Sequence, residues 1–128
     1  MAGRSAEETM VDVKAILELC EKNNPQKIIL MTRPPYNLAI LTPVLERKNS
    51  PEAAKEKAET MQKENSNLAE SFRALAAEKG YGLVDANRFT PSNLPTEGKY
   101  GVHPEGRVFY DFVAMKLTAI ANKEQLVV

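Results

Sequence analysis

Apolar residues recur at helical spacing in three segments of the chain, each bounded by residues that favour helix ends. The first segment begins at Ser5 and stops before Pro25, and the longest begins at Ser50 and stops at Gly80. The last extends from about residue 104 to residue 122. We predict three helices, the middle one either a single unusually long helix or two shorter ones.

Two short segments between these helices are almost continuously apolar. They read KIILMT over residues 27–32 and YGLVDA over residues 81–86. Short apolar runs bounded by proline and glycine are typical of strands buried on both faces, as in a parallel sheet. The order helix, strand, helix, strand, helix predicts an α/β fold with helices on both faces of a parallel sheet.

Two strands make an incomplete sheet, because both of its edges would stay unpaired and it is too small for three helices to cover. Residues 38–50 read as a loop with at most a short helical turn, although a further strand within residues 36–48 is an alternative. Otherwise the missing strands come from a second copy of the chain or from another segment. We therefore expect a homo-oligomer or a missing segment that completes the sheet.

Length and composition predict one domain, residues 1–128, of a globular protein. The 17 basic and 17 acidic residues give a net charge of zero, so we expect no nucleic-acid partner. No apolar run is long enough to span a membrane, and MAGRSAEETM at the N-terminus is not a secretory signal. The single cysteine, Cys20, excludes an internal disulfide and a cysteine-rich metal site, and we place it in the core. We expect no metal and no cofactor, and the compartment stays unknown.

The only histidine, His103, lies in KYGVHPEGRVFY, between a long predicted loop over residues 87–104 and the last helix. Long loops in compact domains are often functional. A neutral imidazole at a helix N-terminus is suited to act as a general base, because the helix dipole disfavours its protonated form. The alternative is a histidine that merely caps the helix or lies at the surface.

Polar residues follow each predicted strand at the edge where open α/β sheets bind ligands. Arg33, Tyr36 and Asn37 follow the first strand, and Asp85 ends the second. They are candidates to line a pocket. Alternatively, Asp85 caps a loop and Arg33 pairs with a nearby acid.

The combination of ILMTRPPYN, LAAEKGYGLVDA and GVHPEG resembles the C-terminal half of SGNH (GDSL-type) hydrolases over roughly residues 7–121. The resemblance implies a flavodoxin-like, three-layer α/β/α sandwich with a parallel sheet, incomplete in this chain. It also implies an esterase or acyl hydrolase that acts on a small ester or an acylated sugar. His103 falls on the position of the family's catalytic base, and Arg33, Tyr36, Asn37 and Tyr100 are the candidate substrate-binding residues.

The chain departs from the family pattern at two points that bear on activity. Tyr100 occupies the position of the aspartate that orients the histidine, and a phenol is neutral at pH 7. The block that carries the nucleophilic serine is absent. Three interpretations therefore remain: an ester hydrolase whose nucleophile comes from outside this chain, a non-catalytic binding or interaction module, and a fragment with little function of its own. We expect the chain alone to be inactive.

Overall fold

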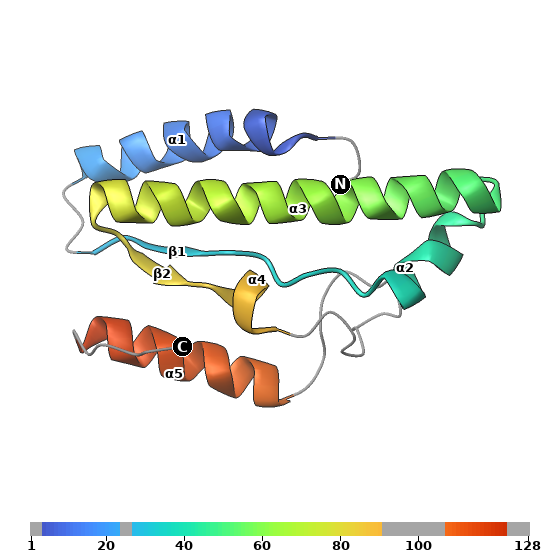
Figure 1. Ribbon diagram of the computed structural model, residues 1–128. Helices are drawn as coiled ribbons and strands as arrows, with labels where there is room; N and C mark the ends of the chain where they lie inside the picture. Colours follow the sequence, from blue (N-terminus) through green and yellow to red (C-terminus); the bar gives the residue numbers. More distant parts are fainter. Residues whose placement is uncertain (1–3, 24–26, 91–106, 123–128) are drawn as a thin grey trace.

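The computed structural model describes residues 4–23, 27–90 and 107–122 (Figure 1). In chain order these residues form α1 (Ala6–Lys22), β1 (Ile29–Met31), α2 (Leu38–Leu45), α3 (Pro51–Lys79), β2 (Gly82–Val84), α4 (Ala86–Phe89) and α5 (Arg107–Ala121). In Figure 1, α1 and α3 lie on one side of the two strands and α5 lies on the other.

The predicted three-layer α/β/α sandwich is wrong, because the described part of the chain is mostly helical. Its sheet has only β1 and β2, of three residues each, paired in parallel with Ile29 opposite Gly82. Each apolar run was expected to form a longer strand, but only its central residues form ladder pairs. Two such strands cannot make a layer that separates helices, and α3 instead contacts α1, α2 and both strands.

Residues 36–48, where a further strand was an alternative, contain helix α2. Asn37 is its N-cap, and its side-chain oxygen accepts a hydrogen bond of 3.1 Å from the backbone N–H of Ala39. Leu41 of α2 is buried against Tyr36 and Ala58. These three residues form a second, smaller core between α2 and α3. This short apolar segment is therefore a helix that packs on α3, and not the further strand of the alternative prediction.

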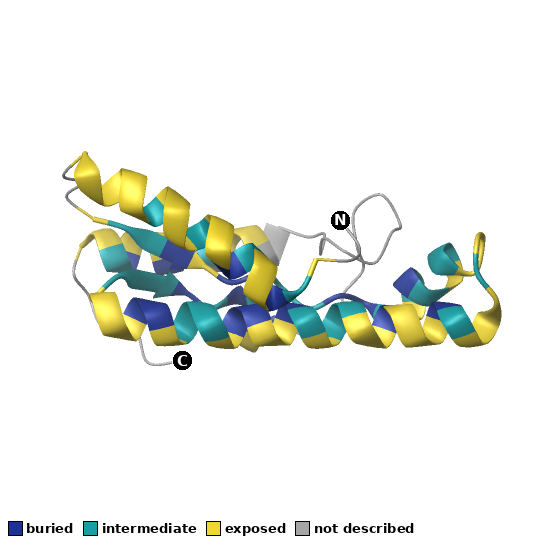
Figure 2. Ribbon diagram, turned by 90° about the horizontal axis from the view of Figure 1, so that it is seen from above, coloured by how far each residue is buried: buried dark blue, intermediate teal, exposed yellow. Residues whose placement is uncertain are grey.

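Helix α3 is one uninterrupted helix of 29 residues, which answers the question left open by the sequence. The Ser50 hydroxyl accepts a hydrogen bond from the Ala53 N–H at its start, and Gly80 adopts the left-handed conformation (φ 72°) at its end. At about 1.5 Å per residue the helix is about 43 Å long, so it passes both α1 and α2. Figure 2 shows buried residues recurring along its whole length.

The main core lies between α1, α3 and the strands. Its buried members are Ala6, Met10, Leu30, Leu68, Leu75 and Ala76. Helix α1 begins at Ser5 as predicted, with a capping box between Ser5 and Glu8. Near its other end the Tyr81 hydroxyl, just before β2, donates a hydrogen bond to Glu21.

The prediction that Cys20 lies in the core is wrong, since its side chain is exposed. Ile16, another apolar residue of α1, is also exposed, at 59%. A turn of about 100° per residue rotates both residues away from Met10 and Leu17, which pack on the core. The apolar stripe of α1 is thus wider than the surface that α3 and the strands cover.

Helix α5 approaches β2 closely at Gly82. A Cβ atom at this position would lie 2.8 Å from Ile120 Cγ2 and 3.2 Å from Ile29 Cγ1. The Lys27 ammonium group also donates a hydrogen bond of 2.7 Å to the Ile120 carbonyl, near the end of α5. Glycine is therefore required at position 82 by the space available, not by its backbone conformation.

We predict that Gly82→Ala lowers the free energy of unfolding by about 1–3 kcal/mol, because the added methyl group overpacks the contact with Ile120. Urea denaturation followed by circular dichroism measures the change. In the double variant Gly82→Ala/Ile120→Ala the two losses should be less than additive. Unchanged stability of Gly82→Ala, or strict additivity, would contradict the close approach of α5.

Candidate ligand groove at the ends of the strands

The two strands are joined at their carboxyl ends by a polar network that α3 completes. Thr32 follows β1, and its hydroxyl donates a hydrogen bond of 2.8 Å to Asp85 Oδ1, which follows β2. Arg73 of α3 donates from Nε to Asp85 Oδ2 at 2.7 Å and from Nη2 to Oδ1 at 3.0 Å. Two parallel bonds between a guanidinium and a carboxylate fix both position and orientation.

The same network holds the start of α4. The backbone N–H of Asn87 donates a hydrogen bond of 2.9 Å to the Thr32 hydroxyl. The Asn87 side-chain oxygen accepts a bond of 3.3 Å from Arg73 Nη2. Arg88 lies 3.8 Å from Asp85 Oδ2 and is mostly exposed. The Thr32 hydroxyl therefore both donates and accepts, and it links the two strand ends to the following turn.

Asp85 is held in its charged form by these partners. Burial alone raises the pKa of its carboxyl, but the hydrogen bonds from Arg73 and Thr32 and the charge of Arg73 outweigh burial and leave the pKa below its ordinary value. The pKa of Arg73 is correspondingly raised, chiefly by its hydrogen bond to Asp85. Both oxygens of Asp85 are engaged, so this carboxylate is a structural clamp and not a free general base.

The loop after β1 is fixed by two amide side chains of α3. Gln62 accepts a hydrogen bond of 2.9 Å from the backbone N–H of Tyr36 and donates one of 2.8 Å to the Tyr36 carbonyl. The Asn65 side-chain N–H₂ donates a bond of 2.9 Å to the Pro34 carbonyl. Since proline ends the ladder, these amides supply the backbone partners that a neighbouring strand would otherwise provide.

This fixed loop forms one wall of a groove of about 410 Å³, which we call the Arg33 groove. Its other walls are the start of α1 and the middle of α3. Arg33 and the buried Tyr36 line it together, with the guanidinium 5.8 Å from the centre of the tyrosine ring. The further lining residues are Arg4, Ser5, Ala6, Thr9, Thr60, Met61, Glu64, Asn65 and Leu68.

The charged side chains that line the groove differ in whether they have a hydrogen-bond or ion-pair partner. Arg4 forms an ion pair of 2.7 Å with Asp12, and Glu64 accepts a hydrogen bond of 2.6 Å from the Ala6 N–H at the start of α1. Arg33, in contrast, has no carboxylate within 4.0 Å among residues 4–23, 27–90 and 107–122. It is thus the cation of the groove that remains available to an anion.

A second group in the groove is also unsatisfied. Asn65 is only 4% exposed, and its side-chain oxygen has no hydrogen-bond partner within the described part of the chain. A buried acceptor without a donor costs free energy, so each such atom in a native protein requires an explanation. The groove therefore has one available cation, and Asn65 in its wall has a buried oxygen whose hydrogen bond is made by no described residue.

The structure brings together some of the sequence-predicted site residues but not all of them. Arg33 and Tyr36 share the groove, whereas the side chain of Asn37 is buried and caps α2. His103 and Tyr100 lie outside the described residues. The alternative that Arg33 pairs with a nearby acid finds no such pair among the described residues. The alternative that the Asp85 side chain caps the following loop is also not seen, because this side chain makes no cap hydrogen bond at α4 and pairs with Arg73.

Three residues of the site, Gln62, Asn65 and Arg73, were not identified from the sequence. Asn65 had a visible signal, because it interrupts the apolar stripe of the long helix. A polar residue on a buried helix face requires a hydrogen-bond partner, and here the Pro34 carbonyl is that partner. Gln62 and Arg73 had no comparable signal, since both residue types are common on exposed helix faces.

The described residues contain no group of three or more histidine, cysteine, aspartate or glutamate side chains that could hold a metal ion. Among the same residues, no helix has the length and apolar content needed to cross a bilayer. Comparisons of the chain with protein-family models, with curated proteins and with solved structures find no match. The resemblance to SGNH hydrolases therefore stays a prediction from the residues.

We predict that Arg73→Leu lowers the free energy of unfolding at pH 7 by about 2 kcal/mol, because it leaves the largely buried Asp85 carboxylate without its cation. Urea denaturation measures the loss. Glu70→Gln is the matched control, since it removes only the ion pair between Arg73 and a 73% exposed carboxylate and should cost less than about 1 kcal/mol. Equal effects of the two substitutions would refute the clamp.

The depressed pKa of Asp85 also predicts a pH dependence. Its contribution to stability is full above the unfolded-state pKa of about 4 and is lost as the pH falls through the lower folded-state pKa. In Arg73→Leu the buried Asp85 carboxyl lacks the cation that lowers its pKa, so the difference in unfolding free energy between the wild type and this variant should be largest near pH 7 and shrink as the pH falls. A difference that stays constant down to pH 2 would show that Asp85 is not the group involved.

Proposed function

We propose that this chain is a non-catalytic binding module whose Arg33 groove takes a small apolar hydroxy acid. The observation that carries the proposal is the Arg33 guanidinium, which faces a groove of about 410 Å³ and has no carboxylate partner among the described residues. A volume of this size suits a small molecule and is larger than a single ion needs.

The chemistry of the lining supports the ligand class. Arg33 favours a carboxylate, because a guanidinium can bind both carboxylate oxygens at once. In this proposal the Asn65 side-chain oxygen, which has no donor among the described residues, accepts from a hydroxyl or amino group of the same molecule. Tyr36, Met61 and Leu68 favour an apolar body. The charge of Glu64 is partly offset because its carboxylate accepts from the N-terminus of α1, where the helix dipole is positive.

The rigidity of the loop supports binding over a structural role for Arg33. Asn65 and Gln62 hold the backbone of Pro34 and Tyr36, which follow Arg33. The Thr32 N–H, just before Arg33, donates to the Val84 carbonyl. Little ordering entropy of the loop therefore remains to be lost when a ligand binds. The other charged residues of the groove, Arg4 and Glu64, have partners, whereas the Arg33 guanidinium lies 5.8 Å from the centre of the Tyr36 ring.

The ester-hydrolase function depends on His103 and on a nucleophile from elsewhere, and it stays a prediction. Among the described serines, Ser5 and Ser50 have their hydroxyls in helix caps. Hydrolysis of p-nitrophenyl acetate by the wild type and by His103→Ala distinguishes the two functions. The binding-module proposal expects both rates at the buffer background, and a rate that the substitution abolishes would overturn the non-catalytic part of the proposal.

We predict that mandelate binds the wild type and that Arg33→Ala weakens this binding by about tenfold to a hundredfold, through loss of a charge-assisted contact. Isothermal titration calorimetry measures the affinities. Arg47→Ala is the matched control, because Arg47 is an exposed arginine that does not line the groove. It removes the same charge and should leave the affinity unchanged.

Two further probes separate the contributions of the ligand's groups. Phenylacetate lacks the hydroxyl group of mandelate, and mandelamide lacks its negative charge. Both should bind more weakly than mandelate to the wild type, and Arg33→Ala should weaken phenylacetate but not mandelamide. Absence of mandelate binding, or equal losses in Arg33→Ala and Arg47→Ala, would contradict the proposed function.

A further inference from the structure

Glu64 of α3 supplies a carboxylate to the wall of the Arg33 groove. Its side chain is half-buried, and its Oε2 atom accepts a hydrogen bond of 2.6 Å from the Ala6 N–H at the start of α1. Among residues 4–23, 27–90 and 107–122, its other oxygen accepts no hydrogen bond and the carboxylate has no cation within 4.0 Å. One oxygen of Glu64 is therefore available to a donor.

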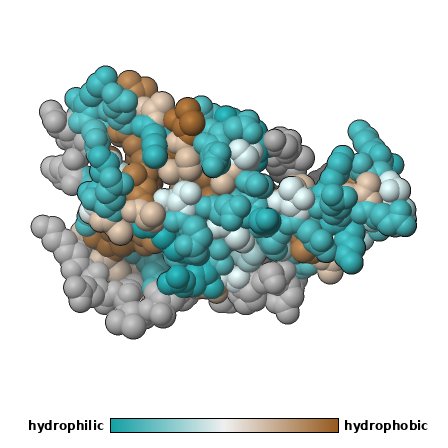
Figure 3. Space-filling model, turned by 45° about the horizontal axis from the view of Figure 1, so that its top comes forward, coloured by the Kyte–Doolittle hydropathy of each residue, from teal (hydrophilic) through white to brown (hydrophobic). Residues whose placement is uncertain are grey.

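The setting of Glu64 differs from that of an ordinary surface glutamate. In Figure 3 the apolar surface gathers at the upper left over α1, whereas the surface to the right, over α3, is mostly hydrophilic. An exposed glutamate on α3 needs no explanation. Glu64, in contrast, is half-buried and lines a groove that also contains a cation.

Arg33 and Glu64 line the same groove without forming an ion pair with each other. No guanidinium nitrogen of Arg33 lies within 4.0 Å of a Glu64 oxygen. The groove thus has a positive group and a negative group that are both open to a ligand. A simple carboxylate is attracted by Arg33 and repelled by Glu64, whereas a zwitterion has a charge for each.

We infer that the groove binds an α-amino acid with an apolar side chain more tightly than the matching hydroxy acid, and that Glu64 selects the ammonium group. The inference rests on the proposed function, because Arg33 binds the carboxylate of both ligands. The ammonium group donates to the available oxygen of Glu64. A hydroxyl group in the same position also donates, but it has no charge to offset that of Glu64.

A purely structural role for Glu64 requires its hydrogen bond but not its charge. Ala6 is the first residue of α1, so its N–H is one of those that a helix leaves without an internal partner. A neutral amide oxygen accepts this bond as well as a carboxylate oxygen does. Glu64→Gln therefore separates the two roles, because it keeps an acceptor for Ala6 and removes the charge.

Isothermal titration calorimetry at pH 7 with phenylglycine and mandelate of the same handedness tests the inference. The two molecules differ only in the ammonium and hydroxyl groups. Phenylglycine should bind the wild type at least about tenfold more tightly than mandelate. In Glu64→Gln this preference should fall to about twofold or less, while urea denaturation shows an almost unchanged stability. Arg33→Ala should weaken the binding of both ligands.

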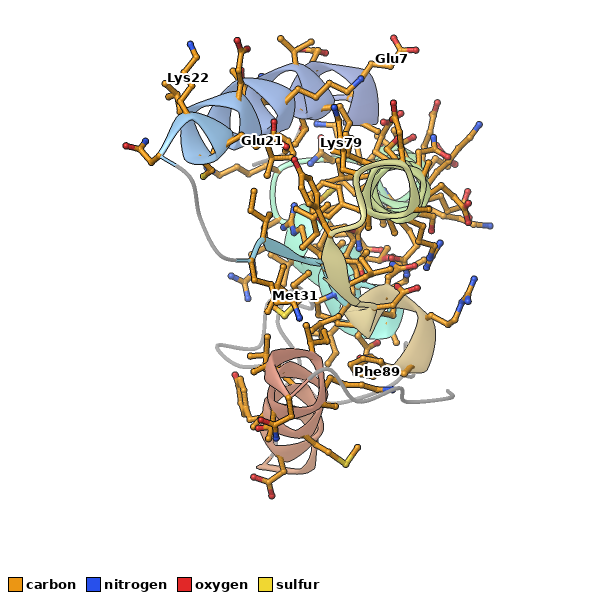
Figure 4. The ribbon with its side chains drawn as sticks, turned by 90° about the vertical axis from the view of Figure 1, so that its left-hand side faces the viewer. Glu7, Glu21, Lys22, Met31, Lys79 and Phe89 are labelled. Atoms are coloured by element: carbon orange, nitrogen blue, oxygen red, sulfur yellow. The ribbon has the colours of Figure 1, made fainter. Side chains whose placement is uncertain are left out.

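Glu7→Gln is the matched control. Glu7 is an exposed glutamate in the first turn of α1 and does not line the groove. Figure 4 shows the labelled Glu7 at the start of α1, where it points away from α3. This substitution removes the same charge beside Ala6 and should leave both affinities unchanged.

The outcomes distinguish this inference from the proposed function. Mandelate binding that depends on Arg33, with phenylglycine bound no more tightly, would overturn the inference alone. So would a preference for phenylglycine that Glu64→Gln leaves intact or that Glu7→Gln weakens equally. Phenylglycine binding that requires Glu64, without any mandelate binding, would support the inference and contradict the hydroxy-acid ligand. Binding of neither molecule would overturn both.

Discussion

The bidentate contact between Arg73 and Asp85 is the interaction on which the rest of the structure depends. β1 and β2 contain three residues each, and a pair of such short strands is not stable alone. The bidentate contact joins the end of β2 to the C-terminal third of α3, and the Thr32 hydroxyl extends the connection to β1. A single carboxylate thereby unites three elements that are far apart in the sequence.

The long helix α3 does for the loop after β1 what further strands would do in a larger sheet. Gln62 bonds both backbone groups of Tyr36, and Asn65 bonds the Pro34 carbonyl. These bonds satisfy backbone groups in a proline-rich segment that cannot form a ladder. They also hold Arg33 at the wall of the groove. The same hydrogen bonds from α3 therefore stabilise the loop and position the residue proposed to bind the ligand.

The helices could be predicted from the sequence because their ends carry local signals. Ser5, Ser50 and Gly80 act at the helix ends where the capping rules place them. The sandwich could not be predicted correctly, because apolar runs indicate burial but not how many residues will find a strand partner. The exposed Cys20 has a similar cause, since the pattern of α1 shows which residues are apolar but not how much of that face is covered.

The candidate site was only partly predictable for a related reason. Arg33, Tyr36 and Asp85 follow strands, and that placement is visible in the sequence. The partners that define their roles lie on α3, and Arg73 is separated from Asp85 by twelve residues with no motif to connect them. Long-range partners of this kind depend on how α3 lies against the strands, which no local pattern specifies.

Helix α3 holds the loop after β1, and we propose that this positions Arg33 to bind the carboxylate of a ligand in the groove. A titration of the ¹⁵N-labelled chain with mandelate, followed by NMR, tests it most directly. The account predicts that the side-chain signals of Arg33 and Asn65 and the backbone amide of Tyr36 shift together and saturate with one dissociation constant. Shifts confined to residues outside the groove, or no shifts, would contradict the account.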